Sequence, residues 1–424
     1  MFRLLATGLA LAATTAATGY PEGSSCPVAL SSLRTNDTTI GLCPTDFDVI
    51  GGELQPVHDC SKAPTGIAVD ASANIFFTYA RNSEPQNWTL TKAVNFTHEE
   101  PWPSEAWQNC ATGQNASECF VNVQNLVLDD NGVFWVIDSG VPHGASYPLT
   151  YGPKILSFNS TTGELIRTYV FPADQFYAKL QLNDLRINNS IGTGGYAFIT
   201  DDTKYGSIST IDLDSGKVVR HLYNTTFTTP DDQFLSFYNG EPLRNWNGTT
   251  WSPITSGSNG IALAGGNVYW SVKASHRWYF VSQEALVRND VSDEELAELI
   301  QVPGNLPSET AGYTADDKGR LYITAAAQSA ILYVDTQQSE VTQEINGVAA
   351  GGSGPVPTAN YLLKTLVRSG LVQHADTACI LDGWLYFNTN QQGLGPWSQY
   401  KNVDKRVGPF RSFRYWIGRG PAPA

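Results

Sequence analysis

Charged residues are scarce in this sequence, and basic residues are scarcer than acidic ones. Asp, Glu, Lys and Arg make up 16% of the 424 residues, and 26 basic against 40 acidic side chains give a formal net charge of -14. No basic stripe offsets this balance, so the surface repels nucleic acid and anionic lipid rather than attracting either. We therefore expect no nucleic-acid partner.

Long apolar runs and the common catalytic motifs are also missing. The apolar segments fall well short of the roughly 20 residues that a membrane-spanning helix needs, so we expect no membrane span. No His-Glu-x-x-His, Gly-x-Gly-x-x-Gly or Gly-Lys-Ser/Thr motif occurs, and Ser139 stands in Asp-Ser-Gly without a Gly-x-Ser-x-Gly elbow. These absences argue against zinc proteases, nucleotide-dependent enzymes and hydrolases with a serine elbow. A pair of carboxylates brought together by the fold for glycoside cleavage stays open.

The N-terminal segment indicates secretion. Arg3 precedes an apolar run at residues 4–13 and small residues follow, which is the layout of a cleaved signal peptide over residues 1–19. The mature chain is therefore expected in the secretory pathway or outside the cell. Eight Asn-x-Ser/Thr sites are then candidates for N-glycosylation: Asn36, Asn87, Asn95, Asn115, Asn159, Asn188, Asn224 and Asn247.

An even number of cysteines suits an oxidising compartment and favours disulfides over metal binding. No Cys-x-x-Cys pair occurs among the six, which argues against a zinc knuckle or a thioredoxin-type site. The short spacing of Cys110 and Cys119 predicts that these two are bonded. The pairing of the other four stays open, and Cys60 with Cys379 requires that the chain ends meet. Those four are Cys26, Cys43, Cys60 and Cys379.

Apolar strands joined by tight turns recur along the chain. In residues 123–140, VQNLVLDDNGVFWVIDSG, an apolar run ends at an Asp-Asp-Asn-Gly turn and a second run follows, which predicts a β-hairpin. Five further hairpins share this order, with an aromatic residue near the centre of the second strand; they begin at Thr65, Asn183, Asn259, Ala311 and Ala375. The copies lie about 50 to 75 residues apart, the scale of a propeller blade with loop insertions.

Second hairpins between these copies complete the blades. They begin at Pro153, Gly206 and Ala330, which gives units of four strands. We predict an all-β fold: one domain, residues 20–424, forming a six-bladed β-propeller with four-stranded antiparallel blades around a central channel. Pairing of residues 46–58 with residues 410–417 would help to close the ring.

Helical signals are few. Ser292 and Glu295 have the spacing of a capping box, which predicts a short helix after Ser292. Residues 361–366 suggest a second short helix, either a plain connection or a lid over the channel. Both helices would be insertions between the blade hairpins.

The sequence resembles the major royal jelly protein and yellow-protein family over roughly residues 50–418. The similarity is carried by a collinear set of segments: DDNGVFWVIDSG from Asp129, PKILSFNSTTGELIRTYVFP from Pro153, GYAFITDD from Gly195, SETAGYTADDKGRLYITAAAQSAI from Ser308, DGWLYFNTNQ from Asp382 and KRVGPFRSFRYWIG from Lys405. The resemblance implies a secreted six-bladed propeller. The sequons and diverged loops look more like a fungal branch, which includes hetero-Diels-Alderases of tropolonic sesquiterpenoid biosynthesis.

Residues just before each first strand are expected to converge on one mouth of the channel, because the innermost strands surround it. They include two carboxylates and two amides, which are hard oxygen ligands of the type that Ca²⁺ takes. The alternative is that these side chains cap neighbouring backbone groups at the turns. The candidate metal ligands are Asn125, Asp184, Asn259 and Asp376.

The loops that leave the second strands share this mouth and mix aromatic with polar side chains, which suits an apolar organic ligand carrying one or two oxygens. Hydrogen-bond donors to a ligand carbonyl are expected at Lys273, His276, His143 and Gln328. Ligand contacts are expected from Tyr205, Trp278, Trp397 and Asn390.

These features lead to one leading hypothesis and two alternatives. The first is a cofactor-free pericyclase that couples a tropolone quinone methide to a humulene-type sesquiterpene. The second is a non-catalytic binding protein for small hydrophobic, oxygenated metabolites. The third is a calcium-dependent lactonase, which requires a metal ion at the Asn/Asp mouth.

Overall fold

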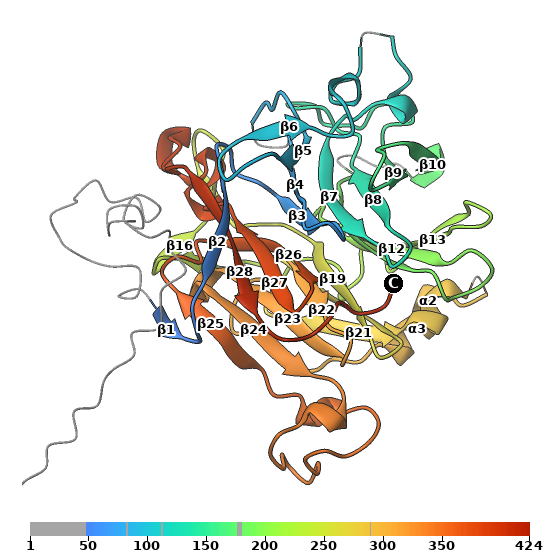
Figure 1. Cartoon of the computed structure of the whole chain (residues 1–424), viewed down its shortest axis with the longest axis vertical. Helices are drawn as coiled ribbons and strands as arrows, with labels where there is room; N and C mark the ends of the chain where they lie inside the picture. Colours follow the sequence, from blue (N-terminus) through green and yellow to red (C-terminus); the bar gives the residue numbers. More distant parts are fainter. Residues whose placement is uncertain (1–47, 82–83, 112, 176–179, 289) are drawn as a thin grey trace, which may run out of the picture.

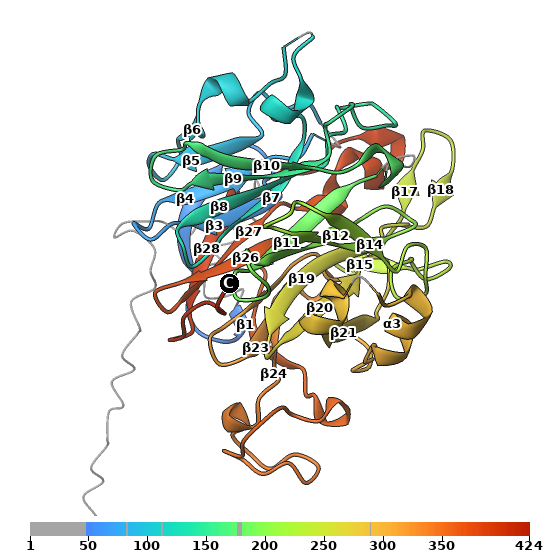
Figure 2. The same ribbon diagram turned by 90° about the vertical axis from the view of Figure 1, so that its right-hand side faces the viewer.

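Six antiparallel sheets are arranged as blades around one axis, as Figures 1 and 2 show. The computed structural model describes residues 48–424, except 82–83, 112, 176–179 and 289. The all-β, six-bladed propeller expected from the repeats is confirmed. The predicted signal peptide, the sequon at Asn36, and Cys26 and Cys43 lie outside the described residues.

The first three blades each contain four strands, as predicted. Blade 1 consists of β3 (Gly66–Val69), β4 (Ile75–Thr78), β5 (Leu90–Ala93) and β6 (Glu99–Pro101). Blade 2 consists of β7 (Val123–Leu128), β8 (Val133–Asp138), β9 (Lys154–Asn159) and β10 (Leu165–Val170). Blade 3 consists of β11 (Leu182–Asn188), β12 (Tyr196–Asp201), β13 (Ser207–Asp212) and β14 (Val218–His221).

Two of the remaining blades depart from four strands. Blade 4 has three, β19 (Ser258–Ala264), β20 (Asn267–Val272) and β21 (Trp278–Ser282), and a single bridge from Phe280 to Gln301 continues its edge. Blade 5 has five: β22 (Tyr313–Ala315), β23 (Arg320–Ala325), β24 (Ala330–Asp335), β25 (Lys364–Ser369) and β1 (Asp48–Ile50). Blade 6 has four: β26 (Ala375–Leu381), β27 (Trp384–Thr389), β28 (Phe410–Trp416) and β2 (Gln55–Cys60).

The ring is closed by a strand from the N-terminal side. β2 pairs antiparallel with β28, as the sequence suggested, so the last blade combines an N-terminal strand with three C-terminal strands (Figure 1). Arg411 on β28 binds Asp59 on β2 through two hydrogen bonds of 2.7 Å. Both side chains are largely buried, and this bidentate pairing fixes the register of the closing strands.

Turns within the hairpins repeat one solution in blades 1, 2 and 5. Asp129 Oδ1 accepts the backbone N–H groups of Asn131 and Val133, both at 2.9 Å. Asp70 and Asp316 accept the N–H groups two and four residues later in the same way. A carboxylate that accepts local backbone donors stabilises the reversal between the strands.

The segments predicted as helices have different outcomes. α3 (Asp293–Leu299) begins at Ser292 with the predicted capping box, after the short α2 (Gln283–Val287). The helix predicted at residues 361–366 is wrong, because Lys364–Ser369 forms β25 against β24. This pairing also replaces the hairpin predicted after Ala330, and the chain between β24 and β25 extends away from the blades (Figures 1 and 2). A fourth strand position on blade 5 outweighs the local helical spacing.

The core lies between the faces of neighbouring blades. Trp135 of β8 is 6% exposed and packs against residues of blades 2 and 3, while its Nε1 donates to Asp129 Oδ2 at 2.8 Å. Among the described residues, no helix is long and apolar enough to cross a membrane.

The cysteines agree with the prediction where it was definite. Cys110 and Cys119 form a disulfide. Cys60 and Cys379 are free within the described part of the chain, although β2 brings the chain ends together. A disulfide is consistent with an oxidising compartment.

Most of the described sequons are accessible. Six of their asparagines are exposed: Asn87, Asn95, Asn115, Asn159, Asn224 and Asn247. Asn188 is only half-buried, and its Nδ2 donates to Gln283 Oε1 at 2.7 Å. A glycan on Asn188 would replace one of the two amide hydrogens available for this contact.

Candidate functional site

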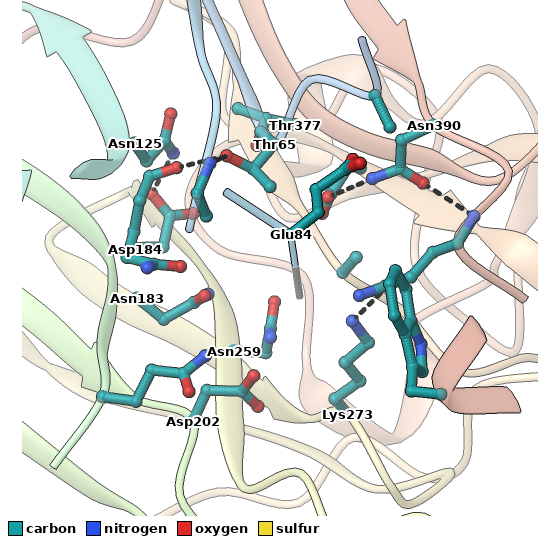
Figure 3. Close-up of a pocket in the computed structure, with 18 of the residues that line it drawn as sticks. Thr65, Glu84, Asn125, Asn183, Asp184, Asp202, Asn259, Lys273, Thr377 and Asn390 are labelled. Carbon is teal, nitrogen blue, oxygen red and sulfur yellow. Dashed lines mark hydrogen bonds between the residues drawn. The ribbon is translucent and has the colours of Figure 1, made fainter. Parts of the chain in front are cut away.

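The polar residues at the channel mouth stand at irregularities of the innermost strands. The register of β11, β19 and β26 shifts where two residues oppose one on the second strand, and β7 shifts just before Asn125. The shifted positions contain Asp184, Asn259 and Asp376. Such bulges re-aim side chains, and here the four predicted residues all line one cavity at the axis. Figure 3 labels Asn125, Asp184 and Asn259 among the lining residues.

Small polar residues on the second strands stabilise these bulges. Thr200 Oγ1 contacts Asp184 N and donates to Asn259 O at 2.6 Å, which joins blades 3 and 4. Asn388 accepts from Thr377 N and donates to Pro64 O, both at 2.8 Å, which joins blades 6 and 1. The mouth is therefore held by hydrogen bonds between neighbouring blades rather than by flexible loops.

Three of the four predicted calcium ligands are engaged with the protein, whereas Asn259 Oδ1 is buried without a hydrogen-bond partner among the described residues. Asn125 Oδ1 accepts from Leu126 N, and Asn125 Nδ2 donates to Asp184 Oδ1 at 2.6 Å. Asp184 Oδ1 also accepts from Leu185 N and from Arg186 Nη1, both at 2.8 Å. Asp376 Oδ2 accepts from Asn390 Nδ2 at 2.6 Å.

The Arg186 guanidinium pairs with Asp184 but does not line the channel cavity. The four residues come together as predicted, but this hydrogen bonding does not fit a calcium site formed by all four. We derive no step through a metal ion at this mouth.

A wider chamber opens above the polar channel. Its volume is about 660 Å³, against about 80 Å³ for the channel cavity, and the two share Gln181, Asp202, Lys273, Gln392 and Trp397. Apolar and aromatic side chains form part of its wall: Tyr147, Tyr205, Leu243, Ile254 and Trp397. A chamber of this size and mixed lining suits a small organic molecule with a few oxygens.

Lys273 lies where the channel and the chamber meet. It follows β20, is 8% exposed, and its Nζ donates to Gln392 Oε1 at 2.7 Å. Buried side chains around the chamber retain unused hydrogen-bonding capacity within the described part of the protein. These atoms are Glu309 Oε2, Asp202 Oδ1 and both ring nitrogens of His374. Because unpaired buried polar atoms cost free energy, they mark positions where a ligand or water binds.

Burial changes the protonation of these groups. It raises the pKa of Asp202 to about 7 and that of Asp376 to about 6, although the Lys273 ammonium opposes both shifts. Burial and, secondarily, Lys273 lower the pKa of His374 to about 3, so its imidazole is neutral at physiological pH. At neutral pH a large fraction of Asp202 is protonated and is able to donate a hydrogen bond.

Of the four predicted donors, only Lys273 lines the channel and chamber among the described residues. His143 is exposed and its Nδ1 contacts Arg81 O at 2.8 Å. His276 Nδ1 contacts Leu306 O at 2.9 Å, and Gln328 is half-buried away from both cavities. The placement expected for these three is corrected, because none of them lines the channel or the chamber and both histidines contact backbone carbonyls instead.

Three of the four predicted ligand contacts have the expected place. Tyr205 and Trp397 line the chamber, and Asn390 lines the channel. The placement of Trp278 is corrected: it is 1% exposed and packs in the core between blades 4 and 5, near Tyr269 and Tyr361. As the first residue of β21 it belongs to a third strand, not to the loop above the mouth.

The sequence prediction missed two buried residues of the chamber. Glu309 and His374 stand shortly before β22 and β26, the first strands of blades 5 and 6. The positional rule that selected Asn259 and Asp376 would have found both if it had been extended by a few residues. Gln181 and Gln392 also line both cavities, and no motif distinguished them.

One family model matches this chain in sequence. Residues 121–356, more than half of the chain, match the family model described as major royal jelly protein. The chain belongs to the major royal jelly protein family. None of the curated proteins is significantly similar to this family member in sequence.

Several solved structures are distantly similar to this family member. A luciferin-regenerating enzyme shares 11% identity, with 87% of this chain and 95% of the other covered and a TM-score of 0.47. Regucalcin, a calcium-binding protein from Agrobacterium tumefaciens, shares 12% identity, with coverages of 87% and 94% and a TM-score of 0.45. A gluconolactonase from Xanthomonas campestris shares 10% identity, with coverages of 86% and 89% and a TM-score of 0.42. Similarity at this level says nothing about the ligand of this chain.

Proposed function

We propose that this protein binds a hydrophobic, oxygenated metabolite in the chamber and acts as a secreted, cofactor-free hetero-Diels-Alderase. The proposed reaction couples a tropolone quinone methide to a humulene-type sesquiterpene. The observation that carries the proposal is the chamber itself, where an aromatic and apolar wall faces the buried Lys273. The resemblance of the sequence to fungal pericyclases of this type supplies the substrate pair.

The chemistry asks little of the protein beyond positioning and hydrogen bonding. In a hetero-Diels-Alder reaction the carbonyl oxygen and the methide carbon of one partner each form one σ bond to the alkene carbons of the other. The π electrons shift within the new ring, and no atom, proton or electron leaves. Such a reaction consumes no cofactor and is accelerated by holding both partners in near-attack geometry.

Lys273 is suited to donate to the carbonyl oxygen of the heterodiene. Negative charge grows on that oxygen in the transition state, and a buried ammonium stabilises it more strongly than water does. Protonated Asp202 lies on the same cavities and offers a second donor. Trp397 and Tyr205 offer faces on which a planar tropolone would stack.

Incubation with a tropolone quinone-methide precursor and humulenol tests the proposal. The protein is expected to raise the rate and fix the stereochemistry of the adduct, and Lys273→Met is expected to lower the rate roughly 100-fold. Lys401→Met, at an exposed lysine beside Tyr400, is the matched control and should leave the rate unchanged.

The same experiment separates the alternatives. The protein would be a non-catalytic binding protein if it bound either substrate saturably while the yield and stereochemistry of the product equalled those of the protein-free mixture. Hydrolysis of lactones that depends on added calcium would favour the lactonase alternative, which the engagement of Asn125 and Asp184 does not support.

A further inference from the structure

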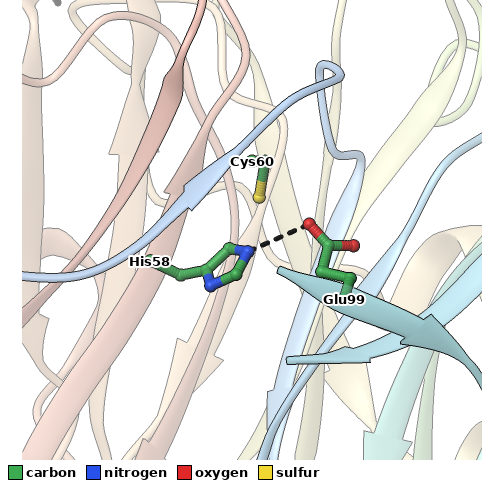
Figure 4. A group of neighbouring side chains, drawn as sticks. All are labelled: His58, Cys60 and Glu99. Atoms are coloured by element: carbon green, nitrogen blue, oxygen red, sulfur yellow. Dashed lines mark hydrogen bonds and ion pairs between the residues drawn. The ribbon is translucent and has the colours of Figure 1, made fainter. Parts of the chain in front are cut away.

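A second cluster of chemically distinctive side chains lies outside the channel and the chamber, where blade 6 meets blade 1. His58 and Cys60 stand on the closing strand β2, and Glu99 stands on β6, the outer strand of blade 1 (Figure 4). One ligand atom of each residue lies within 4.8 Å of the other two. His58 and Cys60 are fully buried, and the Glu99 side chain is 11% exposed.

The hydrogen bonds of His58 orient it as a metal-binding histidine is usually oriented. Its Nδ1 lies 3.0 Å from the carbonyl oxygen of Asn95, which can only accept, so Nδ1 carries a proton. Its Nε2 lies 3.0 Å from Glu99 Oε1. If His58 were neutral, the lone pair on its Nε2 would face the Glu99 carboxylate. Two such acceptors stay in contact only if a cation, either a metal ion or a proton, lies between them.

We propose that His58, Cys60 and Glu99 bind a zinc ion that fastens the closing strand to blade 1. An imidazole nitrogen, a thiolate and a carboxylate form the mixed ligand set that Zn²⁺ accepts, whereas Ca²⁺ and Mg²⁺ prefer oxygen alone. Bond lengths of about 2.0 to 2.3 Å around a tetrahedral ion place neighbouring ligand atoms roughly 3.2 to 3.6 Å apart. The His58–Glu99 contact is close to that spacing, and Cys60 is within reach after a small movement.

Three protein ligands leave the fourth position of a tetrahedral zinc ion to water, and neighbouring side chains hold the ligands in place. Tyr79 Oη shares its hydrogen between the two oxygens of Glu99 at 2.7 and 2.8 Å, and Thr91 Oγ1 donates to Oε2, so the carboxylate is fixed in place. Phe77 lies against the His58 ring with 4.9 Å between ring centres. When zinc binds, Cys60 becomes a thiolate and its proton is released to solvent. The ion enters at the partly exposed edge of Glu99.

Metal titration of the full-length protein tests this inference, which does not depend on the proposed function. Protein freed of metal with a chelator and dialysed is titrated with Zn²⁺ while bound metal and the thermal midpoint are measured. One equivalent per chain and a rise of roughly 3 to 5 °C are expected at saturating zinc. Cobalt in place of zinc should give a thiolate charge-transfer band.

Matched variants identify the ligands. Cys60→Ser should abolish the cobalt–thiolate band, and Glu99→Gln should weaken zinc binding roughly 100-fold while keeping a folded chain. Cys379→Ser, at the other free cysteine in the described part of the chain, is the control and should behave as the wild type. The proposal would be overturned if the wild type took up no zinc, or if Cys60→Ser and Glu99→Gln bound as much zinc as the wild type. A proton on His58 would then be the positive charge that pairs with Glu99.

Discussion

At the scale of single residues, two tryptophans that look alike in the sequence have opposite surroundings. Trp278 is buried in the core between blades 4 and 5, whereas Trp397 is half-buried and lines the chamber, with the Arg406 guanidinium 5.2 Å from its ring centre. Composition does not separate them, because an aromatic side chain serves a core and a ligand wall equally well. Only the three-dimensional positions of the two residues, after β20 and after β27, show which of them belongs to the core and which to the chamber wall.

Replacing each tryptophan by leucine is therefore expected to have separable effects. Trp278→Leu should lower the free energy of unfolding by about 3 kcal/mol, because a large cavity is left in the core, with ligand affinity unchanged in the folded protein. Trp397→Leu should lower ligand affinity with little loss of stability. Chemical denaturation and calorimetric binding measure the two quantities, and a loss of affinity in Trp278→Leu alone would contradict the assignment.

Asp202 gives the protein a pH-dependent stability with a definite sign. Its pKa rises from the ordinary value near 4 to about 7 on folding because of burial. The folded state thus binds the proton more tightly, so this group stabilises the fold below about pH 4 and loses that contribution as the pH rises through 7.

Removing this carboxyl group should flatten that dependence. As the pH rises from 4 to 8, the free energy of unfolding of Asp202→Asn is expected to increase relative to that of the wild type, by up to about 4 kcal/mol. Urea denaturation across this range measures the difference. Asp214→Asn, at an exposed position, is the control and should show no trend. A difference between wild type and Asp202→Asn that stays constant with pH would refute the assignment.

At the scale of elements, the aspartate turns are the most regular feature of the hairpins. Asp129 accepts two backbone N–H groups, Trp135 Nε1 and Asn189 Nδ2. Asp129→Ala should therefore cost about 2 to 4 kcal/mol of stability, because several buried donors lose their partner. The adjacent exposed Asp130→Ala should cost less than about 1 kcal/mol. Equal effects of the two substitutions in denaturant titrations would contradict this role.

The strands and helices were predictable where the sequence signals that specify them are local. Alternating apolar residues and Asp/Asn/Gly turns define the six inner hairpins, and the capping box at Ser292 defines α3. The signals failed at residues 361–366, where pairing with β24 decides the structure, and at blade 4, whose outer edge is a single bridge. Pairing between distant segments is a property of the sheet, and local propensity does not specify it.

At the scale of the whole molecule, the closed ring explains which parts of the site could be foreseen. Closure brings the starts of the first strands to one mouth, so Asn125, Asp184, Asn259 and Asp376 were found from topology alone. The pairing of Asp184 with Arg186 is local, because both stand on β11 two residues apart, whereas the burial of His374 depends on packing between distant segments and was not foreseeable. His143 and His276 likewise line neither cavity, and each ring contacts a backbone carbonyl, of Arg81 and of Leu306.

Calcium should therefore have little influence on the chamber. Because Asp184 is paired with Arg186 and Asn125 accepts a backbone N–H, adding millimolar calcium is expected to change ligand affinity by less than about twofold. Isothermal titration of a tropolone ligand with and without calcium measures this. An affinity that rises tenfold or more with calcium, and returns on its removal, would restore the metal site at the mouth.

The most direct test of the account is a crystal structure with a tropolone-type ligand bound. We predict that the ligand lies in the chamber, with its ring against Trp397 or Tyr205 and its carbonyl oxygen within about 2.7 to 3.2 Å of Lys273 Nζ. A ligand bound at another surface of the propeller, with Lys273 still bonded only to Gln392, would contradict it.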